Sequence, residues 1–217
     1  MHTAETAAEF VLRNTRASRT PLVPEIELLL GNMVIPLWEL VESEFEQQGL
    51  APPYWAFAWP GGQALARYIL DEPSLACGRT VLDFASGSGI AGIAAARAGA
   101  LSVLCADTDP LAAAACALNG VRNHVSLHTT TDDLIGSDLV PDLVLAGDIC
   151  YERNMSSRSI KWLEELVLKG AMVLLGDPGR NYLPKSGLAH LSNYPVKTSL
   201  DLEDRETHRT DVYCLTA

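Results

Sequence analysis

Short apolar runs alternate with helical segments along the chain from Thr80 onward. Runs such as TVLDF and LVLAG have the mainly apolar character of strands that are covered on both faces. The alanine-rich and amphipathic segments between them have the character of helices that connect parallel strands. The pattern predicts strands near residues 80–84, 101–106, 123–128, 142–147, 171–176, 193–201 and 208–216, and helices near residues 90–98, 110–119, 156–168 and 184–191.

This alternation predicts an α/β fold with a doubly wound, mainly parallel sheet. Only the short charged segment Leu202–Thr207 separates the last two predicted strands. Parallel strands need a longer crossover, so these two are expected to form a terminal antiparallel hairpin. A length of 217 residues and an apolar content of 48% are compatible with one such domain.

The region before the first strand is different in character. Residues 1–70 are expected to form an N-terminal extension with an aromatic lid segment, and residues 71–217 the cofactor-binding domain, the two making one structural unit. A short amphipathic helix is expected within Met1–Asn14. Two short helical or extended pieces follow, and Pro24 before Glu25 fits a helix start because proline is tolerated in the first turn.

Four aromatic residues lie within six positions of this extension: Tyr54, Trp55, Phe57 and Trp59. One or two of them are expected in the core. The segment then enters the first strand through a helix expected over Gln63–Leu70. It can therefore lie as a lid across the carboxyl edge of the sheet, where doubly wound sheets bind ligands. Trp59 is the residue most expected beside the ligand.

The loop Ala85–Gly89 joins the first strand to the helix near residues 90–98. Gly87 and Gly89 let a ligand approach the backbone closely, and the start of the helix offers free N–H groups. Asp107 follows the next strand, where its two oxygens can bind a ribose diol. This βαβ unit predicts a site for a nucleoside-containing cofactor.

Acidic residues around the loop bear on which cofactor this is. The G-x-G-x-x-G spacing from Gly87 also occurs in nicotinamide dinucleotide sites, so an NAD-dependent oxidoreductase is one alternative. Asp83, however, lies at the end of the first strand, just before the loop, and would repel a pyrophosphate. S-adenosylmethionine instead carries a positive sulfonium and an α-ammonium group, which a carboxylate suits. Asp148 and Tyr151 follow a further strand at the same edge. These residues favour S-adenosylmethionine.

Four motifs narrow the hypothesis further: W-x-G-G-x-x-L (Trp59–Leu65), D-x-A-S-G-S-G (Asp83–Gly89), D-x-D-P (Asp107–Pro110) and D-x-x-Y (Asp148–Tyr151). Together they resemble the class I, seven-stranded protein-lysine methyltransferases that use S-adenosylmethionine. Within that group, three segments are similar to the lysine methyltransferases of the electron transfer flavoprotein β subunit: Leu22–Ile26, Pro53–Leu65 and Gly176–Arg180. The resemblance covers most of the chain from about residue 20. It departs at Ala85, which stands where the first glycine of the loop usually is.

The resemblance implies a seven-stranded, Rossmann-like sheet, S-adenosylmethionine as cofactor, and a lysine of the flavoprotein β subunit as methyl acceptor. It also implies that Asp132 or Asp133 contacts the adenine amino group, while the other can cap Leu134. Asp109 is expected to be the N-cap of the helix that starts at Pro110. The expected cofactor-binding residues are Trp59, Asp83, Ala85, Ser86, Gly87, Gly89, Asp107, Thr108, Asp132, Asp133 and Asp148.

Asp148 and Tyr151 are the expected catalytic residues. Methyl transfer needs a neutral amine, yet a free lysine has a pKa of about 10.4. Desolvation in an aromatic channel lowers that pKa, whereas a carboxylate favours the ammonium form. Asp148 is therefore expected to bind and orient the lysine rather than act as a strong base, and Tyr151 to hydrogen-bond the amine or line the channel. Arg180 can pair with an acid of the partner protein, with Asp177 or with Glu203.

Alternative functions are a methyltransferase for a ribosomal protein or a small molecule, the NAD-dependent oxidoreductase, and a binding module without catalysis. The net charge of −11 disfavours a nucleic-acid substrate and favours encounter with a basic protein patch. No apolar run approaches the length of a membrane span. The first twenty residues lack the apolar core of a signal peptide, and Glu5 and Glu9 argue against a transit peptide, so a cytoplasmic location is expected.

The five cysteines are scattered and form no C-x-x-C motif. Cys105 and Cys116 fall in apolar segments and are expected to be buried free thiols in a reducing compartment. Cys150 lies beside the expected site, where a structural role is favoured over a reactive one. His124 and His128 have no third ligand at a suitable spacing, so no metal site is expected.

Overall fold

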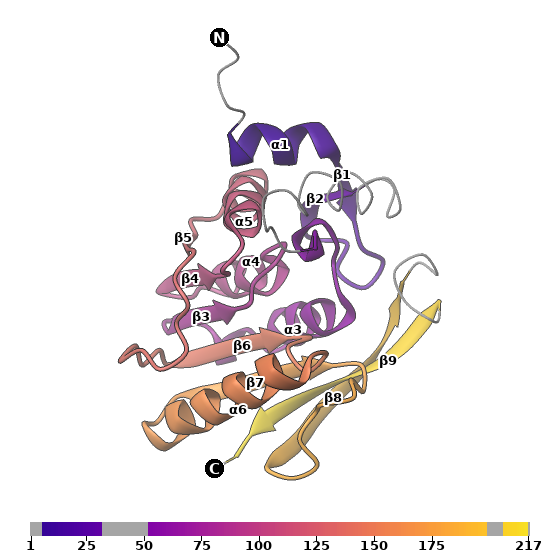
Figure 1. The fold of residues 1–217 in the computed structure, drawn as a ribbon. Coiled ribbons are helices and arrows are strands. Elements are labelled where there is room, and N and C mark those ends of the chain that lie inside the picture. The colour runs from indigo at the N-terminus through magenta and orange to yellow at the C-terminus, as the bar shows by residue number, and fades with distance from the viewer. Residues whose placement is uncertain (1–5, 32–51, 199–205, 217) are drawn as a thin grey trace.

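A seven-stranded mixed sheet forms the centre of the structure, a computed structural model whose described residues are 6–31, 52–198 and 206–216 (Figure 1). The strands follow the order β5-β4-β3-β6-β7-β9-β8, in which β9 runs antiparallel to β7 and β8 and the others are parallel. This confirms the α/β sheet with a terminal antiparallel hairpin. The strand bounds are β3 (Thr80–Phe84), β4 (Ser102–Ala106), β5 (His128–Thr130), β6 (Leu143–Gly147), β7 (Met172–Asp177), β8 (Leu188–Lys197) and β9 (Thr207–Leu215).

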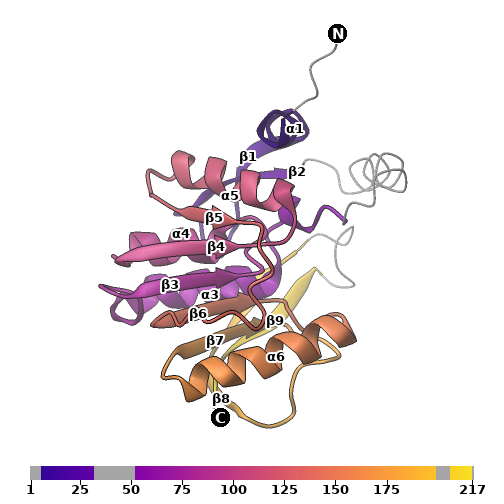
Figure 2. The same ribbon diagram turned by 60° about the vertical axis from the view of Figure 1, so that its left-hand side comes forward.

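Helices cover both faces of this sheet (Figure 2). Because successive side chains of a strand point to opposite faces, Val81 of β3 packs in the core beneath α3 and α4, and Leu82 packs in the core beneath α6. Phe84 meets Trp162 of α6 with ring centroids 5.3 Å apart. The helix bounds are α3 (Pro60–Asp71), α4 (Ile90–Arg97), α5 (Pro110–Arg122) and α6 (Arg153–Leu168), with single turns of 3₁₀ helix at η1 (Tyr54–Ala56) and η2 (Pro73–Leu75).

The N-terminal part adds the predicted helix, α1 (Ala7–Asn14), and a hairpin of β1 (Thr15–Arg19) and β2 (Glu27–Gly31). The helix start expected at Pro24 is wrong, because Pro24 lies in a turn that leads into β2. Two asparagines, Asn119 within α5 and Asn123 at its C-cap, bond the edge of β2 that does not pair with β1. Asn119 accepts a hydrogen bond from the N–H of Leu29 at 2.7 Å, and Asn123 accepts from the N–H of Glu27 at 3.0 Å.

Two other expectations are corrected by the structure. The helix expected near residues 184–191 is absent, since residue 187 is a glycine at φ 75° and β8 begins directly after it, paired with β9. The strand expected at residues 123–128 is shorter and later. Asn123 forms the C-cap of α5 and His124 adopts φ 57°, so the chain turns there before β5 begins.

Glycines seat the first turn of α3 directly on the carboxyl ends of β6 and β7. A Cβ atom on Gly61 would collide with the carbonyl oxygen of Gly176 and lie 2.6 Å from Asp148 Oδ2. A Cβ atom on Gly147 would lie 2.7 Å from the backbone nitrogen of Gly62. The absence of side chains at these positions is what allows helix and sheet edge to touch.

A substitution at Gly61 is expected to separate them. Gly61→Ala should lower the free energy of unfolding by about 1–3 kcal/mol, the cost of overpacking a tight contact. Gly62→Ala is the matched control, since its Cβ would meet only Ile90 Cγ2 at 3.3 Å and alanine is favoured over glycine in helices by about 0.5–1 kcal/mol. Urea denaturation of both variants is the measurement, and equal stabilities would contradict this account.

Candidate functional site

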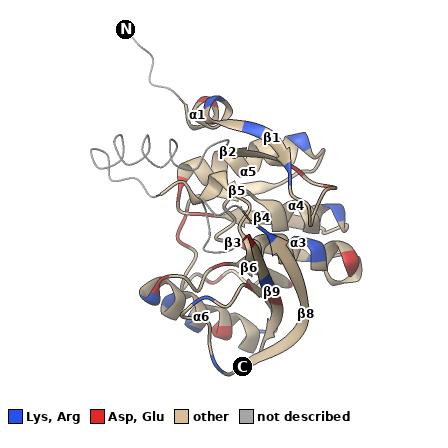
Figure 3. Ribbon diagram, turned by 90° about the vertical axis from the view of Figure 1, so that its right-hand side faces the viewer, with Lys and Arg blue, Asp and Glu red and all other residues tan. Residues whose placement is uncertain are grey.

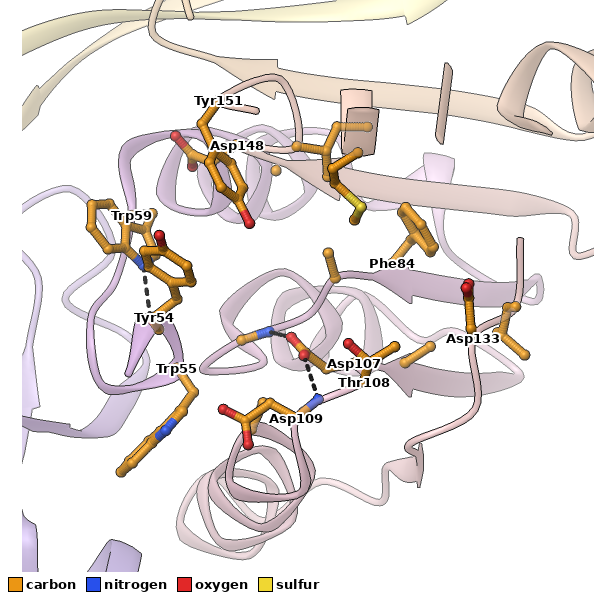
Figure 4. A pocket seen from close by; sticks show the side chains of 18 of the residues that line it. Tyr54, Trp55, Trp59, Phe84, Asp107, Thr108, Asp109, Asp133, Asp148 and Tyr151 are labelled. Carbon is orange, nitrogen blue, oxygen red and sulfur yellow. Dashed lines mark hydrogen bonds between the residues drawn. The ribbon is translucent and has the colours of Figure 1, made fainter. Parts of the chain in front are cut away.

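A cavity of about 630 Å³ lies at the carboxyl edge of the sheet, where strand order reverses between β3 and β6 (Figure 4). Such a switch point is where doubly wound sheets bind ligands. Most of the predicted site residues line it. They are Trp59, Ala85, Gly87, Asp107, Thr108, Asp132, Asp133, Asp148 and Tyr151. Asp83, Ser86 and Gly89 are outside this lining.

Asp107 lines the cavity directly after the end of β4. One of its oxygens accepts from the N–H of Gly87 at 2.9 Å, and the other accepts from the N–H of Asp109 at 3.1 Å. Burial raises the pKa of Asp107, while these two bonds act against the rise. An ionised carboxylate has about four acceptor positions, so two remain for a diol. Asp109 is the N-cap of α5, as predicted, and accepts from the N–H of Leu111.

Asp83 lies behind the glycine loop rather than in the cavity. It is 3% exposed, and its carboxylate accepts from the N–H of Gly92 at 2.8 Å. Gly92 is the third residue of α4, whose N-cap, Gly89, has no side chain to satisfy that donor. Asp83 therefore supplies the missing cap from the neighbouring strand. Burial raises its pKa to about 8. A direct contact between Asp83 and the cofactor stays a prediction.

Asp148 accepts three hydrogen bonds from two parts of the chain. Its Oδ2 accepts from the N–H groups of Gly61 at 2.5 Å and Gly62 at 3.2 Å, at the start of α3. Its Oδ1 accepts from Arg180 Nη2 at 2.9 Å. Burial raises the pKa of Asp148 to about 6, and Arg180 acts against the rise. The residue adopts φ 56°, a conformation uncommon outside glycine.

The ion pair between Arg180 and Asp148 was not predicted. Asp177, one of the partners considered for Arg180, instead accepts from the backbone N–H groups of Gly179 and Arg180 at 2.7 and 2.6 Å. Glu203, the other, lies outside the described residues. No local sequence pattern indicates this ion pair, because the pair forms only when the loop after β7 folds back over the end of β6.

Aromatic rings form one wall of the cavity. Tyr54 lies between Trp59 and Tyr151, with ring centroids 5.8 and 5.5 Å away, and Trp59 Nε1 donates to the carbonyl oxygen of Tyr54 at 2.7 Å. Trp55 and Phe57 are buried in the core, as expected for one or two of the four. Figure 4 shows Asp107, Thr108 and Asp109 on one side of the cavity, across from Asp148 and Tyr151.

The far end of the cavity contains two further carboxylates. Asp132 accepts from Thr130 Oγ1 at 2.9 Å. Asp133 accepts from the N–H of Ile135 at 3.1 Å, one residue beyond the predicted cap position, and pairs with Arg158 at 2.9 Å. Sequence reasoning missed Arg158 as a cavity residue. The one sequence feature that points to Arg158 is its position in the first turns of the helix that follows the D-x-x-Y motif.

The five cysteines differ in burial: three are buried, Cys77 is exposed and Cys214 is half-buried. Cys105, Cys116 and Cys150 are free and buried, which confirms the burial predicted for the first two. Burial raises the pKa of Cys150 to about 11, so it is a thiol at neutral pH. Within residues 6–31, 52–198 and 206–216, no cluster of three metal-ligating side chains occurs, and no helix is long and apolar enough to cross a membrane.

Comparison with known proteins gives relatives over most of the chain and a family model over part of it. An electron transfer flavoprotein β subunit lysine methyltransferase of Xenopus laevis is 38% identical over 190 residues, covering 86% of this chain and 73% of that protein. One of Danio rerio is 40% identical over 175 residues, covering 79% and 67%. A family model described as ribosomal protein L11 methyltransferase (PrmA) matches residues 64–149.

Solved structures show the same fold at low identity. Magnesium protoporphyrin IX methyltransferase (ChlM) from Synechocystis PCC 6803 with bound SAM, S-adenosylmethionine, has a TM-score of 0.52 at 13% identity, covering 86% of this chain and 85% of that chain. Ribosomal protein L11 methylase from Lactobacillus delbrueckii subsp. bulgaricus has a TM-score of 0.50 at 19% identity, covering 72% and 79%. These similarities concern the fold alone.

The raised pKa values predict how stability depends on pH. Asp83, Asp109 and Asp148 have folded pKa values of about 8, 6 and 6, all above the ordinary 3.8. At pH values between the ordinary pKa and the folded pKa of each aspartate, the folded state binds more protons than the unfolded chain. The free energy of unfolding should therefore fall as pH rises from about 4 to 8.

Asp83→Asn should flatten that fall between pH 6 and 8, because Asp83 has the highest of the three pKa values. Urea midpoints at pH 5, 6.5 and 8 measure it. Asp142→Asn is the control, since hydrogen bonds from Thr80 lower the pKa of Asp142 and keep it ionised over this range. Identical slopes for wild type and Asp83→Asn would mean that Asp83 is already ionised at pH 6.

Proposed function

The chain belongs to the electron transfer flavoprotein β subunit lysine methyltransferases, and we propose that it methylates a lysine of that flavoprotein subunit. It is an S-adenosylmethionine-dependent protein-lysine methyltransferase. The observation that carries the substrate proposal is kinship at 38% identity over 86% of this chain and 73% of a relative named for that activity. The cavity, with separate acidic and aromatic walls, supports it.

Within this site, we propose that Asp107 binds the ribose hydroxyls and that the backbone of Ala85–Gly87 lies against the methionine part. Trp59 covers that part from the lid, and Asp132 or Asp133 meets the adenine amino group. Ser86 and Gly89, with Asp83 behind them, shape the loop. The proposed division of the chain at residue 70 then separates a lid-bearing extension from the domain with most of the cofactor contacts.

Asp148 and Tyr151 are the proposed catalytic residues. The cofactor supplies an activated methyl group, so the protein mainly has to position the acceptor. With the cofactor bound, the nitrogen of a neutral lysine amine would bond to the methyl carbon while the electrons of the sulfur–carbon bond pass to sulfur. The methylated ammonium would then lose a proton to water. Asp148 orients the amine through Oδ1, and the ring of Tyr151, next to Tyr54, lines the approach.

A protein partner fits the charge of the molecule better than a nucleic acid. The chain has a net charge of −11, and in Figure 3 the described Lys and Arg residues are spread over many elements, among them α1, β1, α3 and α6. A phosphate backbone needs a concentrated basic surface. We therefore propose a protein substrate without nucleic acid. A cytoplasmic location is the accompanying proposal.

The direct test is methylation of the purified flavoprotein. Wild-type enzyme with isotope-labelled S-adenosylmethionine should label a lysine of the β subunit, located by mass spectrometry of its peptides. A ribosomal protein fraction and a mixture of small amines are the comparison acceptors. Labelling of either of these with none on the β subunit would overturn the proposed substrate while leaving the methyltransferase activity intact.

The ribose role has its own test. Asp107→Ala should weaken S-adenosylmethionine binding by about 1.5–3 kcal/mol, the range for a hydrogen bond to a charged group. Isothermal titration calorimetry measures it. Asp142→Ala, at the opposite end of β6 where Asp142 bonds Thr80 at 2.8 Å, is the control and should bind the cofactor normally. Unchanged affinity in a folded Asp107→Ala variant would remove Asp107 from the ribose site.

A further inference from the structure

We propose that Arg180 is a positioning residue of the acceptor site: it holds Asp148 in place and sets a fixed positive charge beside the entering lysine, so that the lysine binds as a neutral amine. The inference rests on the proposed function of this cavity and extends it to a residue outside the D-x-x-Y motif. It follows from how many hydrogen bonds Asp148 already accepts.

The oxygens of Asp148 have little capacity left. Two backbone N–H groups of α3, those of Gly61 and Gly62, occupy Oδ2, and Arg180 Nη2 occupies one position of Oδ1. A carboxylate oxygen has about two lone-pair positions, so Oδ1 can accept one further donor. An amine bound to Asp148 therefore shares Oδ1 with the guanidinium group. It stands next to a positive charge whenever it is bound.

The guanidinium is itself fixed at this place. The backbone N–H of Arg180 donates to Asp177 at 2.6 Å, and its carbonyl oxygen accepts from the N–H of Leu183 at 3.2 Å. Its side chain, 21% exposed, lies 5.9 Å from the ring centroid of Trp59. The positive charge lies between a carboxylate and an indole and is partly shielded from solvent. Charge interactions are stronger in such a place than in water.

Other charged and titratable groups surround the same space. Asp148 and Asp177 lie at the ends of β6 and β7, and Asp211 of β9 pairs in register with Asp177. Asp107 lies at the end of β4 and Glu152 caps α6. The uncharged members are Tyr54, Cys150 and Tyr151. Tyr54, Tyr151 and Cys150 have raised pKa values and are neutral near pH 7. The carboxylates of this group favour the protonated, ammonium form of a bound lysine. Arg180, which pairs with Asp148, has the opposite charge and disfavours that form.

The two charges of the ion pair have opposite effects on an amine. A carboxylate alone stabilises ammonium and slows methyl transfer, which needs the free lone pair of nitrogen. With Arg180 on the same oxygen, Asp148 still accepts a hydrogen bond from a neutral amine but gives less preference to its protonated form. Arg180 also acts against the raised pKa of Asp148, which keeps that carboxyl ionised at neutral pH.

The test is the pH profile of turnover for charge-removing variants. Arg180→Gln and Arg180→Met should raise the apparent pKa of kcat by about one unit or more, so that turnover falls at least about tenfold at pH 7 and recovers by pH 9–10. Methionine keeps an aliphatic stem against Trp59, which provides a second variant if glutamine unfolds the loop. Arg180→Lys keeps the charge and should stay close to the wild-type profile.

Arg158→Gln is the matched control, because Arg158 also lines the cavity and pairs with an aspartate at 2.9 Å, but at the far end. Its apparent pKa of kcat should equal that of wild type, whatever happens to its KM for cofactor. Calorimetry should show S-adenosylmethionine binding by the Arg180 variants within about threefold of wild type, since Arg180 is not among the proposed cofactor contacts.

Failure of this inference differs from failure of the proposed function. A uniform loss of turnover at all pH values in the Arg180 variants, with an unmoved pKa, would mean a structural role only and would overturn the inference. A wild-type enzyme that methylates no lysine of any protein would overturn the proposed function itself. An active wild type with a shifted profile in Arg180→Gln and an unshifted one in Arg158→Gln supports both.

Discussion

The contact between the first turn of α3 and the carboxyl edge of the sheet is the constraint on which the site depends. A helix start carries N–H groups without intrahelical partners, and here Asp148 takes those of Gly61 and Gly62. Pro60, the first residue of α3, has no N–H to satisfy. The lid is fixed from the same point, because Trp59 is the N-cap residue and Gln63 donates to the carbonyl oxygen of Ala58 at 2.6 Å.

One carboxylate thus serves the fold and the chemistry together. Truncating Asp148 removes the proposed acceptor ligand, and it also removes the acceptor of two helix N–H groups and of Arg180 Nη2. Removing the acceptor of buried donors lowers the stability of the fold. Loss of activity on truncation therefore cannot separate the two roles. Arg180 bonds Oδ1 of Asp148, whereas the helix N–H groups bond Oδ2. A substitution of Arg180 therefore changes the acceptor site and keeps the cap of α3.

The elements that sequence predicted well are those whose pattern is local. Strands β3, β4, β6 and β7 carry their apolar character within five or six residues, and their predicted ends fall within one residue of the observed ones. The predicted helix near residues 184–191 overlaps strand β8, whose conformation depends on its pairing with β9. The Asn119 contact with β2 and the Arg180 pair join segments far apart in sequence, and no local pattern indicates them.

The aspartates near strand ends show why residue type alone did not settle the site. Asp83 pairs in register with Cys105 and lies inside the sheet, where its side chain reaches the start of α4. Asp107 follows Ala106, the last paired residue of β4, and Asp148 follows Gly147, the last of β6. A carboxylate within the ladder is enclosed by the next layer, whereas one placed a residue beyond it stands over the sheet edge. Register therefore separates Asp83, enclosed behind the glycine loop, from Asp107 and Asp148, which line the cavity.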